Sequence, residues 1–308
     1  MNARFDVVAL GEAMVEFNAA HAGDSRAWLQ DFGGDTSNMA IAAARLGARC
    51  AYVTRDGYDP FGRWLVALWT DEGVSTEAVA IDDDAPTGVY FVSHGPHGHE
   101  FSYRRAGSAA SRMTPASLPL AVLRAARVLH VSAISQAIST SACDACFAAI
   151  DAARAGGAKI SYDTNLRLKL WPLARAKAII VETLREADWA LPGLDDAKLL
   201  FGHDDPSRIA DACHALGSAI VVVKLGRGGC LVSDGARREH VGGVRVSAVD
   251  ATGAGDCFDG AFAARMVAGD DVFTAARYAN TAAAIATTGY GAVAPLPRAV
   301  DVERFACA

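Results

Sequence analysis

The sequence predicts an α/β protein with a mostly parallel central sheet that is covered by helices on both faces. Short apolar runs rich in Val and Ile alternate with Ala-rich segments of helical length from about residue 125 onward, and this alternation is typical of parallel sheets. Two β-rich runs between residues 87 and 105 stand apart from that rhythm. Because no low-complexity linker or fixed repeat interrupts the chain, we expect one domain over 1–308, with a small β-sheet lid formed by about 12–34 and 87–105.

The composition narrows the class of protein. The 308 residues include 29 basic and 35 acidic side chains, which gives a net charge of −6, and 52% of them are hydrophobic. These values are ordinary for a globular protein, and the absence of a Lys/Arg-rich run argues against a nucleic-acid partner. No apolar stretch is long enough to cross a bilayer, and no signal-like segment opens the chain. With an odd count of seven cysteines, we expect reduced thiols, a cytoplasmic location and no membrane partner.

The first half of the chain yields both strands and helices. Apolar runs that end at glycine read as buried strands, whereas Glu12–Phe17 alternates and is expected to be half exposed. The first helix has Asp35 or Thr36 as its candidate cap, and the second has Pro near its start. The predicted strands are Phe5–Leu10, Glu12–Phe17 and Cys50–Thr54, and the predicted helices are Asp35–Leu46 and Pro60–Glu72.

The second half alternates more plainly. A hairpin is expected between residues 87 and 105, where a Gly/Pro-rich tip separates two β-rich runs. Beyond it, β-branched runs mark strands and Ala-rich runs mark helices. The predicted strands are Val128–Ser132, Lys159–Asp163, Trp189–Pro192 and Ala219–Leu225; the predicted helices are Ala142–Ala155, 173–186, Gly255–Ala268 and Val272–Thr288.

The strongest chemical signal is the segment 250–260, which reads DATGAGDCFDG. Gly253 and Gly255 free the backbone for a tight turn and a close approach to a ligand. The predicted helix that follows has unpaired N–H groups and a partial positive charge at its start, which suits a phosphate. Asp256 in the first turn could accept the proton of a hydroxyl that attacks a phosphoryl group. The alternative is a capping acid with no chemical role.

Two motifs resemble signatures of the ribokinase-like, PfkB-type carbohydrate kinases. Residues 250–262 are similar to the family's C-terminal signature, and the Gly33–Asn38 segment, with Leu46-Gly47 after it, is similar to the first one. The motifs lie more than 200 residues apart in the expected order. The resemblance implies a ribokinase-like fold and Asp256 as the catalytic base. It also implies that the backbone of Gly253, Ala254 and Gly255 stabilises the transferring phosphoryl group.

Three further segments resemble 2-keto-3-deoxygluconate (2-dehydro-3-deoxy-D-gluconate) kinases, namely 11–17, 101–111 and 163–171. That substrate is a sugar acid, and the guanidinium groups of Arg105 and Arg167 could bind its carboxylate. A surface ion pair is the alternative for each arginine. The resemblance implies a substrate pocket lined by Gly33, Gly34, Asn38, Tyr90, Tyr103, Arg105, Ile134, Arg167 and Asp256.

The resemblance also implies ATP and Mg²⁺ as cofactors. Lys224 opens a KLGRGG turn after a predicted strand, and the alternative is a plain tight turn between two strands. The implied nucleotide-binding residues are Asn165, Arg167, Lys224, Gly226, Gly228, Gly229, Gly253, Gly255 and Asn280.

Two positions depart from the family pattern. Relatives often carry Asn-x-x-Glu where this chain has Gly193 and Asp196, so we expect Asp196 to act on the metal indirectly. Arg104 replaces an aromatic residue that usually precedes Arg105, which would alter the sugar site.

These features predict ATP-dependent phosphorylation of 2-keto-3-deoxygluconate at its terminal hydroxyl, giving the 6-phosphate and ADP. The alternatives are a kinase for a neutral sugar such as fructose or ribose, and a non-catalytic sugar-binding protein on the same fold. A dinucleotide-dependent oxidoreductase is disfavoured because no G-x-G-x-x-G follows the first predicted strand. The lid is expected to close over the sugar, and the resemblance implies a homodimer or larger homo-oligomer.

Three features are assigned no function. A cysteine pair lies within a predicted helix without a second pair nearby, so a zinc or redox site is disfavoured. Histidines at a hairpin tip indicate an exposed turn rather than a metal site, and two tryptophans indicate core or interface. These residues are Cys143 and Cys146, the histidines at 94, 97 and 99, and Trp64 with Trp69.

Overall fold

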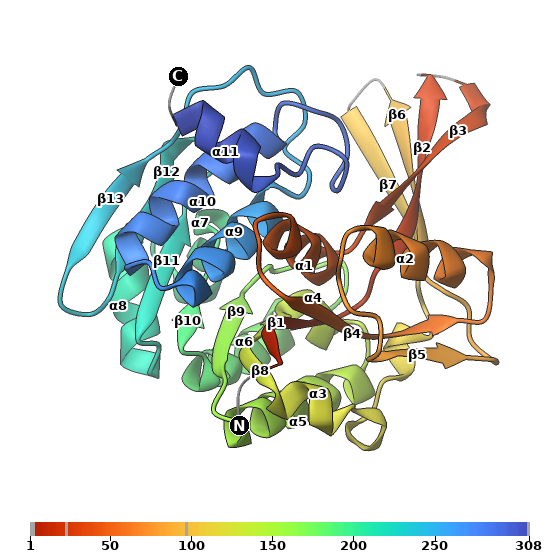
Figure 1. Ribbon diagram of the computed structural model, residues 1–308, viewed down its shortest axis with the longest axis horizontal. Coiled ribbons are helices and arrows are strands. Elements are labelled where there is room, and N and C mark those ends of the chain that lie inside the picture. The colour runs from red at the N-terminus through yellow and green to blue at the C-terminus, as the bar shows by residue number, and fades with distance from the viewer. Residues whose placement is uncertain (1–3, 22–23, 96–97, 307–308) are drawn as a thin grey trace.

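The computed structural model describes residues 4–21, 24–95 and 98–306, and its centre is a nine-stranded sheet (Figure 1). From residue 126 to 224 the strands alternate with helices along the chain, as the β-branched and Ala-rich runs predict. The strands of this sheet are β1 (Phe5–Leu10), β4 (Cys50–Gly57), β5 (Val79–Asp82), β8 (Ala126–Ser132), β9 (Lys159–Asp163), β10 (Trp189–Ala190), β11 (Ile220–Lys224), β12 (Gly229–Ser233) and β13 (Arg238–Gly242).

The strand order across the sheet is β13-β12-β11-β10-β9-β8-β1-β4-β5. All pairs from β11 to β5 are parallel, and only β12 and β13 run antiparallel to their neighbours. The order reverses at β1, because the chain moves first to β4 and later to β8 on the other side of β1. In open α/β sheets, ligands bind beyond the carboxyl ends of the strands at such a switch point.

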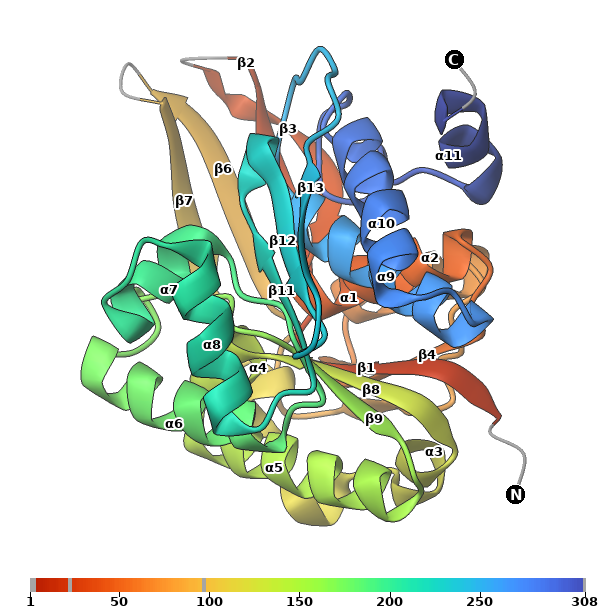
Figure 2. The ribbon, with the colours of Figure 1, turned by 90° about the vertical axis from the view of Figure 1, so that its left-hand side faces the viewer.

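Helices cover both faces of the sheet, as the parallel pairing requires (Figure 2). Each face has its own apolar core, and β1 contributes to both: Val7 and Ala9 to one, Val8 and Leu10 to the other. One layer contains α1 (Asp35–Arg45), α2 (Pro60–Asp71), α9 (Ala254–Ala268), α10 (Val272–Ala286) and α11 (Ala299–Ala306). The other contains α3 (Leu120–Arg124), α4 (Ala133–Ala137), α5 (Thr140–Ala155), α6 (Leu173–Glu186), α7 (Leu194–Phe201) and α8 (Pro206–Leu216).

A second, four-stranded sheet projects from the main body at the upper right of Figure 1. Its order is β3 (Asp24–Gly33), β2 (Met14–His21), β6 (Val89–Gly95) and β7 (Gly98–Arg104), and β2 pairs with β6 in parallel. The separate small sheet expected from the sequence is therefore confirmed, and its closure over a sugar stays a prediction.

The strand expected at Glu12–Phe17 was placed too early and judged too exposed. β2 begins at Met14, and Glu12 lies before it in the turn after β1. Val15 packs into the main core while Met14 packs against Tyr90 in a small cluster of the second sheet. Both faces of the strand are covered, so alternation in the sequence did not mean exposure.

Three other expectations on the elements needed correction. Neither Asp35 nor Thr36 caps α1, because the helix starts at Asp35 after Gly34, whose φ is 129°. β10 contains only Trp189 and Ala190, so the predicted strand was too long. The sequence analysis also missed several elements that are too short for the spacing of their apolar residues to be recognised. These are β5, β12, β13, α3, α7, α8 and α11.

The features assigned no function are explained by packing where the structure describes them. Trp69 is fully buried and donates its ring N–H to Ser37, whereas Trp64 is 42% exposed. Cys143 and Cys146 are buried in α5 with free thiols. The tip residue His97 lies outside the described residues.

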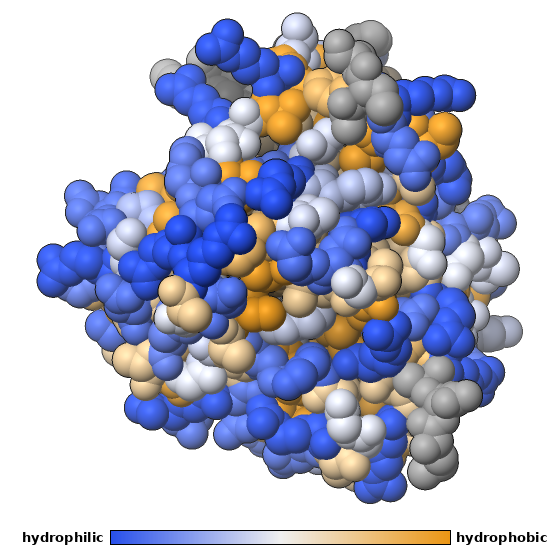
Figure 3. Space-filling view, turned by 60° about the vertical axis from the view of Figure 1, so that its left-hand side comes forward, coloured by the Kyte–Doolittle hydropathy of each residue, from blue (hydrophilic) through white to orange (hydrophobic). Residues whose placement is uncertain are grey.

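Hydrophilic residues cover most of the face in Figure 3. In the described part of the chain, no helix is both long enough and apolar enough to cross a membrane.

Helices α1 and α9 pack closely because Gly260 lies at their contact. A β-carbon at Gly260 would lie 2.5 Å from the Met39 carbonyl oxygen and 2.8 Å from the Ala42 β-carbon. The first atom is backbone and cannot rotate away. Only glycine therefore lets the two helices approach this closely.

We expect Gly260→Ala to destabilise the fold, although alanine is the better helix former. Overpacking of this kind costs about 1–3 kcal/mol of unfolding free energy, measurable by urea denaturation. Gly242→Ala is the matched control, because a β-carbon there meets no atom within 4 Å. Equal stability of the two variants would contradict the close α1–α9 packing.

Candidate active site

Polar residues gather at the carboxyl edge of the main sheet, some of them predicted from the sequence and some not. Asp163 ends β9, Lys224 ends β11, and Ser132 ends β8. Helices α1 and α9 begin at the same edge, where hydrogen bonds join Asn38 to Asp256 and Asp35 to Ser132. These contacts lie beyond the switch point of the sheet, where ligands of such folds bind.

Asp256 lies in the first turn of α9, which follows the left-handed residue Gly253 (φ 73°). A β-carbon at Gly253 would lie 2.9 Å from the Ala292 carbonyl oxygen, so both its conformation and its surroundings require glycine. The helix begins at Ala254, and its first N–H groups have no acceptor within the helix itself. This end of α9 is suited to an anion beside the Asp256 carboxylate.

The Asp256 carboxylate is half-buried and accepts a hydrogen bond from the Asn38 amide, with Nδ2 and Oδ2 2.8 Å apart. Burial, reinforced by the charge of Asp35, raises the pKa of Asp256 to about 7, and the Asn38 hydrogen bond opposes this rise. A carboxyl group with a pKa near neutrality can accept and return a proton under ordinary conditions.

Asp35 is a site residue that the sequence analysis considered only as a helix cap. Its Oδ2 accepts hydrogen bonds from Ser132 and from Asn165, the latter at 3.2 Å. Its Oδ1 is buried without a hydrogen-bond partner. Burial raises the pKa of Asp35, and the charge of Asp163 contributes to the rise. Its place directly after Gly33-Gly34, at the start of a helix on this edge, was the available signal.

The expected sugar-binding residues lie where β2, β3, β6 and β7 meet the main body. A β-carbon at Gly33 would lie 2.3 Å from the Tyr90 hydroxyl, and at Gly34 it would lie 2.7 Å from the Glu12 carbonyl oxygen. The ring of Tyr90 stacks on that of Tyr103, with centroids 5.6 Å apart. The structure thus brings these residues together, while Ile134 is half-buried in α4. Their contact with a sugar stays a prediction.

Arg105 forms a buried ion pair with Glu12, which is the residue that follows β1 and its glycine. The Arg105 side chain is 12% exposed, and Glu12 also accepts a hydrogen bond from Ser108. The surface ion pair considered for this arginine is therefore replaced by a buried one. Arg104, next to it, is exposed and donates to the Ser102 hydroxyl and to the Tyr103 carbonyl oxygen.

Arg167 and Asp196 face each other at the other side of this edge. One Asp196 oxygen accepts a hydrogen bond from the Leu166 N–H at 2.9 Å and lies 4.0 Å from an Arg167 nitrogen. The Arg167 side chain is 54% exposed. It is the less constrained of the two arginines predicted to bind a carboxylate.

Asp196 could offer a carboxylate to a magnesium ion bound with ATP. No group of three or more metal-binding side chains occurs in the part of the chain that the structure describes. Mg²⁺ usually keeps several waters and binds through one or two carboxylates plus phosphate oxygens. Asp196, which lies with Asp195 in the first turn of α7, fits such an indirect contact.

The expected nucleotide side has a different geometry at two residues. Lys224 donates to Asp163 and Asp259, and Leu225 and Gly229 close a tight turn between β11 and β12. The Asn280 amide donates to the carbonyl oxygens of Val241 and Gly242. Both side chains already have partners, so nucleotide contacts at these two residues stay predictions.

The sequence analysis missed Asp163, Ser132 and Asp259 as polar residues of the site. Asp163 and Ser132 were visible as the last residues of two predicted strands, because carboxyl ends of parallel strands meet at one edge. Asp259, three residues after Asp256 on the same helix face, was signalled only by helical spacing.

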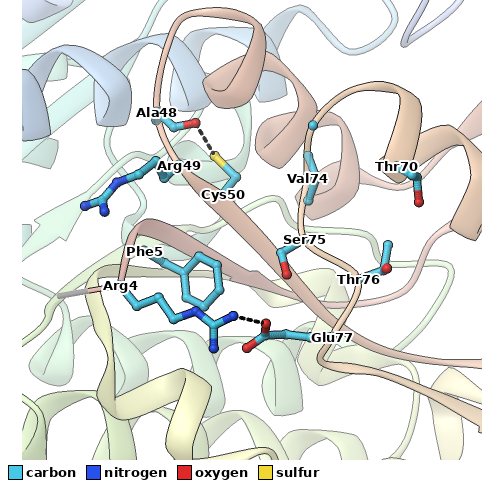
Figure 4. Close-up of a pocket in the computed structure, with 11 residues that line it drawn as sticks. Arg4, Phe5, Ala48, Arg49, Cys50, Thr70, Val74, Ser75, Thr76 and Glu77 are labelled. Carbon is cyan, nitrogen blue, oxygen red and sulfur yellow. Dashed lines mark hydrogen bonds and ion pairs between the residues drawn. The ribbon is translucent and has the colours of Figure 1, made fainter.

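An open groove of about 710 Å³ lies elsewhere, at the amino ends of the strands (Figure 4). Arg4 pairs with Glu77 there, and Arg49 pairs with Asp6. Since these cations and carboxylates neutralise one another in pairs, the groove lacks the raised carboxyl pKa seen at the carboxyl edge among the residues that the structure describes.

Comparison with known proteins agrees with this geometry. Residues 4–299 match the family described as pfkB family carbohydrate kinase. The chain is 34% identical to the 2-dehydro-3-deoxygluconokinase of Thermoproteus tenax, over 98% of this chain and 94% of that protein. It is also 33% identical to probable fructokinase-4 of Arabidopsis thaliana, over 96% of this chain and 95% of that protein.

Solved structures show the same fold. A PfkB protein from Polaromonas sp. JS666 has a TM-score of 0.89 and 32% identity, covering 97% of this chain and 99% of that one. A putative ribokinase II from E. coli in complex with ATP and Mg²⁺ has a TM-score of 0.91 and 26% identity, covering 98% and 99%. The ribokinase-like fold expected from the sequence is confirmed. The chain belongs to the pfkB family of carbohydrate kinases, and it is a sugar kinase.

Proposed function

We propose that this sugar kinase transfers the γ-phosphoryl group of ATP to the terminal hydroxyl of 2-keto-3-deoxygluconate, giving the 6-phosphate and ADP. The observation that carries the proposal is Asp256, a carboxylate with a pKa of about 7 at the start of α9. Asp256 takes the proton of the hydroxyl as its oxygen attacks the phosphorus. The Gly255 N–H in the first turn of α9 stabilises the charge on the transferring group, whereas the Ala254 N–H donates to the Ala251 carbonyl oxygen at 3.2 Å and would have to exchange that acceptor to contribute.

The remaining residues bind and orient the two substrates. Asn38 holds the Asp256 carboxylate in place, and the stacked rings of Tyr90 and Tyr103 provide a flat wall for the sugar. Arg167 is the exposed cation available to the substrate carboxylate. Mg²⁺ bound with ATP would neutralise phosphate charge, and Asp196 would hold it through water.

A neutral sugar such as fructose is the second candidate, because Arg105 is already neutralised by Glu12 in a buried ion pair. The relatives named fructokinase are as similar to this chain as the deoxygluconokinases. A screen of ATP consumption with 2-keto-3-deoxygluconate, its galactonate epimer, fructose and ribose tests both candidates. Turnover of fructose alone would overturn the sugar-acid proposal.

We expect Asp256→Asn to lower kcat by at least about a hundredfold, as loss of a general base typically does. The fold should survive, because burial raises the Asp256 pKa and the charged form is therefore disfavoured in the folded state. The thermal midpoint at pH 8 checks this. Asp211→Asn, in an exposed pair with Arg238, is the control. Near-normal turnover of Asp256→Asn would remove the residue from the mechanism.

The pH dependence follows from the same group. Asp256 must be unprotonated to accept a proton, and its pKa is about 7. We expect kcat/KM to be level above that pH and to fall as pH decreases through about 7, approaching tenfold per unit. Steady-state rates between pH 5.5 and 9 measure this limb. A profile that stays level down to pH 5.5 would contradict a base in this environment.

We expect Arg167→Ala to raise KM for 2-keto-3-deoxygluconate about tenfold or more, since a lost charged hydrogen bond costs about 1.5–3 kcal/mol. Initial rates over a range of sugar concentrations measure this, and KM for ATP is measured in parallel. Arg127→Ala is the control, because Arg127 pairs with Asp6 at the amino end of the sheet. A rise for ATP alone would place Arg167 at the nucleotide instead.

A further inference from the structure

A buried ion cluster lies directly beneath the start of α9. The Lys224 ammonium donates to Asp163 Oδ2 at 3.0 Å and to both oxygens of Asp259, at 3.0 and 2.9 Å. The side chains are 14%, 7% and 1% exposed for Lys224, Asp163 and Asp259, respectively. The cluster joins the ends of β9 and β11 to the second turn of α9.

Its position relates it to the proposed base. A β-carbon at Gly255 would lie 3.7 Å from the Lys224 nitrogen, so the ammonium is next to the turn that precedes Asp256. Asp259 lies three residues after Asp256, on the same face of the helix. Holding Asp259 therefore fixes the orientation of the first turn of α9.

Most of the hydrogen-bonding capacity of Lys224 is used by its two acidic partners. An ammonium group has three hydrogens: one is directed at Asp163, and a second is shared between the two oxygens of the Asp259 carboxyl group. The position of Lys224 is thus set by the end of β9 and by α9. Whether its remaining hydrogen also reaches a nucleotide is decided by the binding experiment below.

The charges that face Asp256 come from three different elements. Asp35 on α1 and Asp163 at the end of β9 oppose its ionisation, whereas Lys224 at the end of β11 favours it. His130 on β8 is close to Asp163 and Lys224 but stays neutral, because burial lowers its pKa to about 4. Lys224 is thus the cation that offsets the acidic groups around the base.

We propose that Lys224 is a positioning residue for the phosphoryl transfer: it anchors α9 through Asp259 and favours the ionised form of Asp256 against its acidic neighbours. The inference rests on the proposed role of Asp256 as base. Lys224 touches neither substrate, so its effect reaches the reaction only through the orientation and charge of Asp256. A buried ion cluster rarely stabilises a fold more than apolar packing would. Stability alone therefore does not explain why these three charged residues are buried together.

The acidic limb of the pH profile is the fall of kcat/KM as pH decreases, and two variants should move it in opposite directions. Lys224→Met removes the favourable charge, so the limb should move to higher pH by about one unit, with partial recovery of activity above pH 8. Asp163→Asn keeps an acceptor for Lys224 but removes the repelling charge, so the limb should move to lower pH. A variant that is merely unstable would lose activity without such a pair of shifts.

Binding of a non-hydrolysable ATP analogue, measured by calorimetry, distinguishes a positioning role of Lys224 from a direct contact with the nucleotide. The proposal expects its Kd to change less than about twofold in Lys224→Met. Lys159→Met is the matched control, because Lys159 forms an exposed pair with Asp188 at the opposite end of the sheet. If Lys224→Met fails to fold, the shift of the acidic limb of kcat/KM in Asp163→Asn alone tests the inference.

Two results would overturn the inference. One is an unshifted limb in both variants, and the other is weakened analogue binding with the limb unmoved. A wild-type profile without any acidic limb would instead count against Asp256 as base, so failure of the proposed function is distinguishable from failure of this inference.

Discussion

The hydrogen bond between Asn38 and Asp256 is the interaction on which the site depends. It joins the first turns of α1 and α9, which are 218 residues apart in the sequence. Both helices must start at the same edge of the sheet for it to form, and their close approach relies on the missing side chain of Gly260. The packing of α1 against α9 thus sets the position of the Asp256 carboxylate at the carboxyl edge of the main sheet.

The acidic groups at this edge differ in the partners that surround them, and that difference separates their roles. Burial would raise the pKa of Asp163, but the charge and hydrogen bond of Lys224 lower it further, so the pKa lies below its usual value and Asp163 is ionised. Asp256 receives only the neutral amide of Asn38, so burial prevails and its pKa rises to about 7. Carboxyl groups whose environments push their pKa values apart are the usual source of distinct acid and base roles. A charged donor is not sufficient by itself, because burial raises the pKa of Asp259 although Lys224 also donates to it; the balance of burial against each donor makes the difference.

The sequence was sufficient for the fold class, the order of the main strands and helices, and Asp256 at a helix start. Long periodic runs such as Ala219–Leu225 and two glycine-rich motifs carry that information locally. The sequence did not predict which side chains pair with one another, because each pair joins chain segments that are far apart in the sequence. Arg105 and Glu12 lie 93 positions apart, and the Lys224 partners come from β9 and α9. β2 was misjudged for the same reason, since Val15 packs into a core built from distant segments and Met14 packs against Tyr90 of β6.

The buried pair of Arg105 and Glu12 also bears on how a kinase of this kind distinguishes a sugar acid from a neutral sugar. The pair is neutral overall and sits in the body of the protein, so a substrate carboxylate gains no net attraction from it. Hydroxyl groups can hydrogen-bond to Arg105 whether or not the sugar is charged. Selection for an acid would then rest on Arg167, which is 54% exposed and lies 4.0 Å from Asp196. A few charges of this kind would suffice to separate a sugar-acid site from a neutral-sugar site, in keeping with the similar identity, 34% and 33%, to kinases named for each substrate.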